Sequence, residues 1–194
     1  MRAFFICLFV FMGGGKIAMA KDPVVGVTLS FPWVNNYKYV DYEYKTVRKK
    51  SGFFGLGIGA YYKRNDYKIS FNIGLTEDLD SPIGAIDYSR PNTRSNISSQ
   101  FAELVCHYPF YKSLNAILGL NYTSYKYEFT SFEDRFFWYK KTDHTLGFSA
   151  GVEYRFNKYI SAAAIYRPAF ASFETDGIYR HVISLDIRID ITAK

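Results

Sequence analysis

Residues 183–191 read ISLDIRIDI, and this run decides the fold class of the chain. Its odd positions are isoleucine or leucine, whereas its even positions are serine, aspartate or arginine. Successive side chains of a β-strand point to opposite faces, so strict alternation predicts a strand with one apolar and one polar face. An α-helix would repeat its apolar positions every three or four residues instead. We therefore expect an amphipathic strand within residues 179–191.

Seven further stretches show the same period of two, which makes eight expected strands. The seven are residues 24–33, 54–62, 67–75, 98–108, 114–124, 146–155 and 160–168. Short connections alternate with long ones, and the long ones cover residues 35–50, 76–95 and 127–141. The first of these is expected to be a loop or a hairpin that extends beyond the barrel. The pattern predicts an all-β fold, an eight-stranded antiparallel up-and-down β-barrel.

The sizes of the side chains indicate which face points outward. Phe, Leu, Ile, Tyr and Trp occupy the apolar face of nearly every expected strand, whereas glycines are frequent on the polar face. The interior of an eight-stranded barrel is just wide enough for side chains to fill, so the compact polar face fits inside. The bulky face would form an outer band suited to lipid, on strands of about the 9–11 residues that cross a bilayer. We therefore predict a transmembrane barrel.

Aromatic residues recur near the ends of the expected strands. Tyrosine is a good strand former, so any single one says little. Together they favour two girdles at the membrane interfaces. They include Trp33, Tyr62, Tyr67, Tyr108, Tyr122, Tyr154 and Tyr166.

Ionisable residues on the polar face are balanced in sign, with four basic and four acidic residues. Buried charges persist only when they are paired, so we expect a charge network that fills the lumen. Its members are Lys68, Glu103, Glu153, Arg155, Arg167, Asp186, Arg188 and Asp190. Mixed charges on the wet outside of a soluble barrel would give the same alternation. A lipocalin-like barrel with an apolar ligand inside, or a sandwich, is therefore the alternative fold.

The first 20 residues have the composition of a secretory signal peptide. Arg2 supplies the basic start, residues 4–12 the apolar stretch, and residues 18–20 (Ala-Met-Ala) a small-x-small cleavage site. The apolar stretch is about half of the 20 residues that a transmembrane helix needs. We expect cleavage after Ala20, which leaves residues 21–194 as the exported barrel domain.

Charge and cysteine content exclude several other classes of protein. Cleavage would lower the formal net charge from +6 to +4, and the remaining basic residues are interspersed with acidic ones, so no nucleic-acid surface is predicted. Cys7 would leave with the signal peptide, so Cys106 would have no partner for an internal disulfide. The scattered histidines and cysteines lack the usual spacing of metal ligands. We assign no metal and no cofactor.

In overall layout the chain resembles the small outer-membrane β-barrel proteins of Gram-negative bacteria, the class that includes OmpX and the membrane domain of OmpA. The resemblance rests on the signal peptide, the hairpin-like run VEYRFNKYI at residues 152–160 and the amphipathic last strand. It implies an outer-membrane barrel of this size. In that class the last strand usually ends in an aromatic residue used in assembly, whereas this chain ends Ile191-Thr192-Ala193-Lys194.

These features predict a non-enzymatic membrane scaffold with surface loops for binding or envelope integrity, and a packed polar lumen rather than a wide pore. The expected partners are outer-membrane lipid and lipopolysaccharide, with another envelope protein as a further candidate. The basic and aromatic loop residues that suit such contacts are Tyr37, Tyr39, Arg48, Lys49, Lys50, Phe136, Phe137 and Trp138.

A barrel enzyme that acts on outer-membrane lipid, of the lipid A deacylase or phospholipase type, is the alternative function. It requires a serine activated by a histidine that an acid orients. His107 shares a face with Glu103, but no neighbouring serine on that face is evident. His181 and Ser184 have opposite parity and should point to different sides. We therefore assign no catalytic residue.

Overall fold

The computed structural model describes residues 22–35, 37–41, 46–50, 53–78, 93–131, 137–172 and 181–192. The expected signal peptide and the loop residue Phe136 lie outside these ranges. No helix among the described residues is long and apolar enough to cross a membrane.

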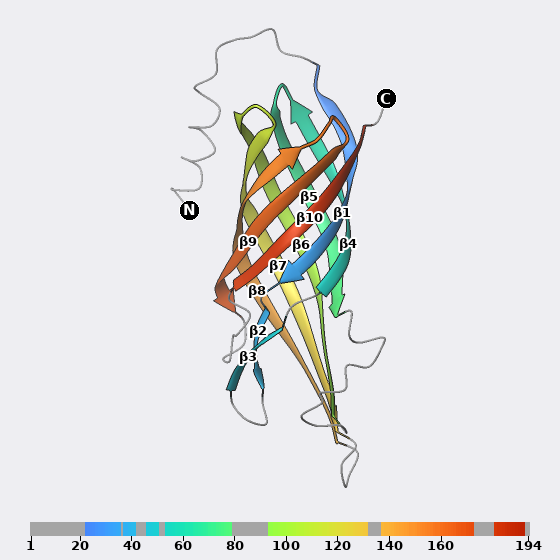
Figure 1. The fold of residues 1–194 in the computed structure, drawn as a ribbon, viewed down its shortest axis with the longest axis vertical. Coiled ribbons are helices and arrows are strands. Elements are labelled where there is room, and N and C mark those ends of the chain that lie inside the picture. Colours follow the sequence, from blue (N-terminus) through green and yellow to red (C-terminus); the bar gives the residue numbers. More distant parts are fainter. Residues whose placement is uncertain are drawn as a thin grey trace.

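Eight strands form one closed antiparallel barrel, so the predicted fold is confirmed (Figure 1). Consecutive barrel strands pair with each other, and β10 pairs with β1 to close the sheet. Their bounds are β1 Val24–Asn35, β4 Phe53–Arg64, β5 Tyr67–Asp78, β6 Thr93–Tyr111, β7 Leu114–Ser131, β8 Phe137–Arg155, β9 Ile160–Ser172 and β10 His181–Thr192.

The long connections contain more strand than the sequence predicts. β2 (Tyr37–Asp41) and β3 (Thr46–Lys50) form a separate two-stranded antiparallel sheet. Of the two forms expected for the first connection, a loop or a hairpin, the structure therefore has the hairpin. β7 continues to Ser131 and β8 begins at Phe137, so the expected connection over residues 127–141 was wrong for most of its length. The three strands β6, β7 and β8 extend past the end of the barrel on the same side as the hairpin (Figure 1).

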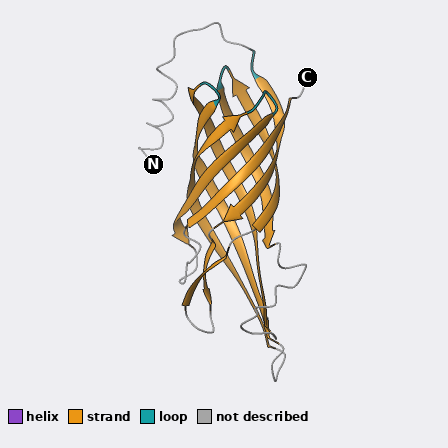
Figure 2. Ribbon diagram, in the orientation of Figure 1, coloured by secondary structure: helices purple, strands orange, loops and turns teal. Residues whose placement is uncertain are grey.

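Three short turns lie at the opposite end of the barrel (Figure 2). They connect β4 to β5 at residues 65–66, β6 to β7 at residues 112–113, and β8 to β9 at residues 156–159. In the third turn Asn157 Oδ1 accepts hydrogen bonds from the backbone N–H groups of Tyr159 (2.8 Å) and Ile160 (2.9 Å). The side chain of asparagine thereby takes the place of a backbone acceptor and fixes the turn.

The two faces of the barrel are oriented as the volume argument predicts. Outward-facing apolar side chains such as Phe71 and Leu185 are 52% and 53% exposed. Polar residues at the alternate positions are buried, and Lys68 is only 1% exposed. Such a surface would be unstable in water, because contiguous apolar area of this extent drives association. In a bilayer the same band faces lipid.

Close packing explains why the inward face is rich in glycine. A Cβ atom added at Gly74 would lie 2.5 Å from Cζ of Phe101 and 2.6 Å from the backbone oxygen of Leu56. Any side chain at this position would therefore have to displace an inward-facing aromatic ring or the next strand. The missing side chain leaves the space that Phe101 fills.

The prediction of a polar lumen is incomplete, because part of the interior is apolar. Val105, Ile117, Ala163 and Ile165 form a buried cluster contributed by β6, β7 and β9. In the sequence, Val105 indicates this cluster, because it is an apolar residue on the same face as Glu103 in the expected strand at residues 98–108. The lumen therefore combines a small hydrocarbon core with a charge network, and both fill space.

Replacing Ile187, which is outward-facing on β10, by arginine should destabilise the barrel in bilayers by about 2–4 kcal/mol, because the charge would enter the hydrocarbon region. The measurement is the free energy of unfolding in urea of barrel refolded into phospholipid vesicles. Ile187→Leu is the control and should unfold close to wild type. Equal stability of Ile187→Arg and wild type would contradict the outward orientation of this face.

Candidate functional site: the charged lumen and the extended strands

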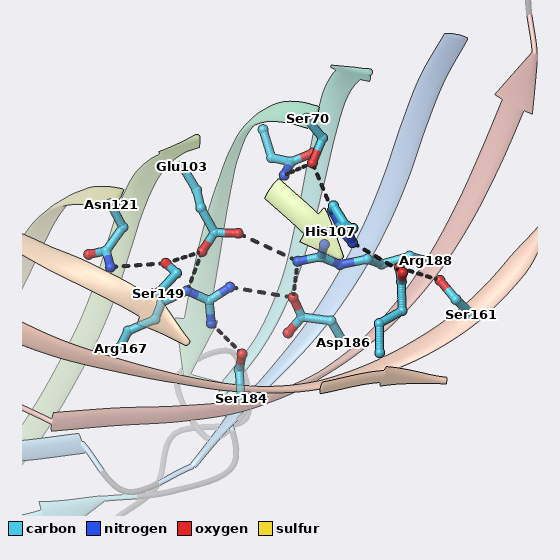
Figure 3. A network of polar contacts seen from close by, with 12 residues as sticks. Ser70, Glu103, His107, Asn121, Ser149, Ser161, Arg167, Ser184, Asp186 and Arg188 are labelled. Atoms are coloured by element: carbon cyan, nitrogen blue, oxygen red, sulfur yellow. Dashed lines mark hydrogen bonds and ion pairs between the residues drawn. The ribbon is translucent and has the colours of Figure 1, made fainter. Parts of the chain in front are cut away.

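Four of the inward-facing charges meet in one cluster inside the barrel. Figure 3 shows Glu103 from β6, Arg167 from β9, and Asp186 and Arg188 from β10 pointing toward one another. Arg167 Nε lies 2.6 Å from Glu103 Oε2, and its Nη2 lies 3.4 Å from Asp186 Oδ2. Arg188 Nη2 lies 3.1 Å from Asp186 Oδ2 and 3.5 Å from Glu103 Oε1. Two guanidinium groups thus neutralise two carboxylates in a space that water hardly enters.

Serine hydroxyls add further hydrogen bonds to this cluster. Ser149 Oγ donates to Glu103 Oε2 at 2.8 Å, and Arg167 Nη1 donates to Ser184 Oγ. Asn121 Nδ2 donates to Ser149 Oγ at 3.1 Å and extends the network to β7. Charge pairs in a low-dielectric interior stabilise a fold only when such additional partners are present.

A second ion pair joins β5 to β10 beside the seam between the first and last strands. Lys68 Nζ, from β5, lies 2.7 Å from both carboxylate oxygens of Asp190 on β10. Thr28, which is opposite Asp190 in the β1–β10 register, donates its hydroxyl to Asp190 Oδ1 at 2.7 Å. The Lys68 ammonium also lies 4.8 Å from the centroid of the Tyr61 ring. Residues from four strands therefore meet at the seam.

A third cluster surrounds Glu153 on β8. Its Oε2 lies 3.1 Å from Nδ1 of His107 and accepts a hydrogen bond from Asn115 Nδ2 at 2.9 Å. Its Oε1 accepts a hydrogen bond from Ser161 Oγ at 3.0 Å. Arg155 Nε, the nearest cation, is 3.6 Å from Oε2, and the Arg155 side chain is partly exposed at the end of the strand.

The other ring nitrogen of His107, Nε2, lies 3.1 Å from Oγ of Ser70. The expectation that no serine neighbours His107 on the inward face was therefore wrong. In the register of β5 with β6, Lys68 is opposite His107, so Ser70 lies one diagonal step away. Sequence parity alone could have placed Ser70 on the inward face, but its distance from His107 depends on the register.

Ser70, His107 and Glu153 have the order of contacts found in serine hydrolases, with the acid on Nδ1 and the hydroxyl on Nε2. Their surroundings differ from those of an active site. Ser70 and His107 are each 1% exposed. Attack on an acyl group requires the acyl carbon within about 3–3.5 Å of the nucleophile. In the structure, Ser70 is enclosed by packed side chains and has no open approach for an acyl group.

The structure brings all eight expected lumen charges to the inward face, in the three clusters described above. The expected surface residues lie apart from them. Tyr37 and Tyr39 are on β2, Arg48, Lys49 and Lys50 are on β3, and Phe137 and Trp138 begin β8. In the hairpin register Tyr37 is opposite Lys50 and Tyr39 is opposite Arg48.

The extended strands form a three-stranded sheet beyond the barrel. β6 pairs with β7 from Thr93, whereas β5 pairs with β6 only from Ser98. β8 pairs with β7 from Phe137, whereas β9 pairs with β8 only from Thr145. Within the described chain, residues 93–97 and 137–144 therefore have a neighbouring strand on one side only.

Metal binding has no support in the described residues, where no group of three or more His, Cys, Asp or Glu is placed to hold an ion.

A closed eight-stranded sheet with an apolar outer band and a charged interior defines a small transmembrane β-barrel. The sequence matches the family described as outer membrane protein beta-barrel domain over residues 5–186, and the chain belongs to this family. It is a protein of the outer membrane, as the resemblance to small Gram-negative barrels implied.

Solved structures agree on the fold. Ail, the attachment invasion locus protein of Yersinia pestis, superposes with a TM-score of 0.61 at 10% identity, over 88% of this chain and 100% of Ail. Ail in complex with the heparin analogue sucrose octasulfate gives a TM-score of 0.54 at 11% identity, over the same shares of the two chains. A major outer membrane protein from Thermus thermophilus gives 0.52 at 11% identity, over 86% of this chain and 99% of that one. A comparison with curated proteins found no match.

Replacing Arg188 by leucine should lower the free energy of unfolding by about 3 kcal/mol, because Asp186 and Glu103 would share one remaining guanidinium in a buried site. The measurement is urea unfolding of the refolded barrel in phospholipid vesicles. Lys126→Leu is the control. It breaks an exposed salt bridge with Glu128 of 2.7 Å and should cost less than about 1 kcal/mol. Equal midpoints for Arg188→Leu and wild type would contradict a structural role of the network.

Proposed function

We propose that this protein is a non-enzymatic outer-membrane scaffold whose barrel holds a binding surface at the cell exterior. The binding surface consists of the β2–β3 hairpin and the extended parts of β6, β7 and β8. The observation that carries the proposal is the unequal length of the strands. β6, β7 and β8 have 19, 18 and 19 residues, against 12 in β4 and β5.

The extra length supports a role outside the bilayer. About 9–11 residues of a tilted strand cross the hydrocarbon region, so roughly two fifths to a half of each long strand is not needed for spanning. Outer-membrane barrels have short turns on the periplasmic side and longer loops on the extracellular side. The extended sheet and the hairpin lie at the end opposite the short turns (Figure 2), which is the extracellular end by this rule.

The edges of the extended sheet suit a protein partner. An edge strand offers backbone N–H and C=O groups that an extended segment of another chain can pair with. Within the described chain, residues 93–97 of β6 and 137–144 of β8 are such edges, because they pair with β7 on one side and with no strand on the other. We infer that a second envelope protein, or a protein at the cell surface, adds a strand here.

The hairpin suits an anionic sugar, and we infer lipopolysaccharide as its partner. The register places tyrosine opposite a basic residue in two pairs, Tyr37 with Lys50 and Tyr39 with Arg48. Basic groups bind phosphate or sulfate through charge-assisted hydrogen bonds, and aromatic rings pack against the apolar faces of sugars. The Ail complex provides a parallel, since Ail is there bound to a sulfated sugar analogue.

The packed interior supports a scaffold rather than a channel or an enzyme. Charged side chains and the apolar cluster around Ile117 fill the lumen, and an eight-stranded barrel has no room for more. The contacts among Ser70, His107 and Glu153 favour a serine hydrolase as the second candidate function. Their burial argues against it, because a lipid substrate would have to reach Ser70 through the wall or the packed lumen.

The triple variant Arg48→Gln, Lys49→Gln, Lys50→Gln should bind lipopolysaccharide about tenfold more weakly than wild type, because three exposed charge contacts of about 0.5 kcal/mol each are lost. The measurement is the Kd for purified lipopolysaccharide, with barrel in phosphatidylcholine nanodiscs, at two salt concentrations. Wild-type affinity should fall with added salt.

The control for this experiment is the triple variant Arg64→Gln, Lys112→Gln, Lys158→Gln, which removes the same charge at the short-turn end. It should keep the wild-type Kd for lipopolysaccharide. An unchanged Kd in the hairpin variant would overturn the assignment of the hairpin.

A further inference from the structure

We propose that the short turns bind the headgroups of anionic glycerophospholipids in the leaflet that they face. The proposal goes beyond the function above, since it concerns the opposite end of the barrel. It rests on a feature shared by all three described turns, since each turn, together with the strand end beside it, combines an exposed cation with an exposed aromatic ring. The cations are Arg64, Lys112 and Lys158, and the adjoining rings are those of Tyr62, Tyr111 and Tyr159.

Ring contacts hold two of these cations at the membrane surface. Lys112 Nζ lies 5.3 Å from the centroid of the Tyr111 ring, and Lys158 Nζ lies 4.6 Å from that of Tyr159. Both distances are within the range of a cation–π interaction. The aromatic rings of a barrel girdle lie at the level of the lipid headgroups. The ammonium groups are therefore placed at the level of the lipid phosphates.

The backbone at Lys112 indicates that the local fold does not require lysine there. Its φ is 40°, in the left-handed region that glycine and asparagine adopt at lower cost. The equivalent position in the first turn is Asn65, with φ of 56°. A lysine at this position weakens the turn, and phosphate binding gives it a role that glycine could not fill.

The charge balance at this end favours an anionic partner. Asp22 and Asp66 are the exposed acidic residues of the described chain near the short turns. Within the described residues, Arg64, Lys112 and Lys158 form no salt bridge with a carboxylate. Basic side chains next to an anionic membrane surface each add to its attraction. Three cations spaced around one rim suit several single-charge headgroups better than one compact ligand.

The test uses barrel reconstituted in nanodiscs that contain equal amounts of phosphatidylglycerol and phosphatidylcholine. After release into mild detergent, native mass spectrometry counts the lipids that stay bound to folded protein. Wild type should retain phosphatidylglycerol over phosphatidylcholine in about tenfold excess. The triple variant Arg64→Gln, Lys112→Gln, Lys158→Gln should retain the two lipids about equally, because it keeps the aromatic rings and loses the cations.

Two control variants separate the turn sites from net charge. Arg64→Lys, Lys112→Arg, Lys158→Arg should keep the phosphatidylglycerol excess. The hairpin variant Arg48→Gln, Lys49→Gln, Lys50→Gln has the same net charge as the neutral turn variant and should also keep it. An unchanged excess in the neutral turn variant, or an equal loss in the hairpin variant, would overturn the proposal. Should the triple variant fail to insert, an unchanged excess in both Lys112→Gln and Lys158→Gln would overturn it as well.

Discussion

The pairing of β1 with β10 is the constraint on which the rest of the structure depends. A bilayer offers no hydrogen-bond partners to an open sheet edge, so a transmembrane sheet must close on itself. The register runs from Gly26 opposite Thr192 to Asn35 opposite Ile183. Once the sheet is closed, each strand has one face toward lipid and one toward a narrow interior. Lys68 on β5 and Asp190 on β10 then meet inside the lumen beside the seam, and their ion pair reinforces the closure that buried them.

A filled interior moves function to the two ends of the barrel. Arg167 and Arg188 from neighbouring strands balance Glu103 and Asp186, which leaves a rigid body without a wide pore. The long-strand end carries an extended sheet and a basic hairpin, and the short-turn end places cations beside aromatic rings. We propose that one end serves recognition at the cell surface and that the other anchors the barrel in phospholipid. The barrel wall keeps the two surfaces a membrane thickness apart.

Alternation made most of the fold predictable, because the lipid face must be apolar in every spanning strand. The same rule fails outside the membrane, where both faces are wet, and residues 127–141 were therefore expected to be a connection rather than parts of β7 and β8. Parity placed every lumen charge on the inward face. The expectation of a polar lumen did not include the buried residues Ile117 and Ile165, because a packed lumen accepts apolar side chains as well. The contact of His107 with Glu153 could not be predicted, because these residues lie on β6 and β8, which both pair with β7, and their inward side chains meet only when the sheet curves into a barrel.

Closure of the chain into a barrel, with its apolar face outward in the outer membrane, underlies every other property described above. Electrophoresis of the purified outer-membrane fraction, with and without boiling, tests this closure most directly. A closed barrel held by a continuous hydrogen-bonded sheet resists unfolding by detergent at room temperature, so the unheated band should migrate differently from the boiled one. Recovery of the protein in the aqueous periplasm, with one mobility before and after boiling, would contradict a transmembrane barrel and place the bulky face inside.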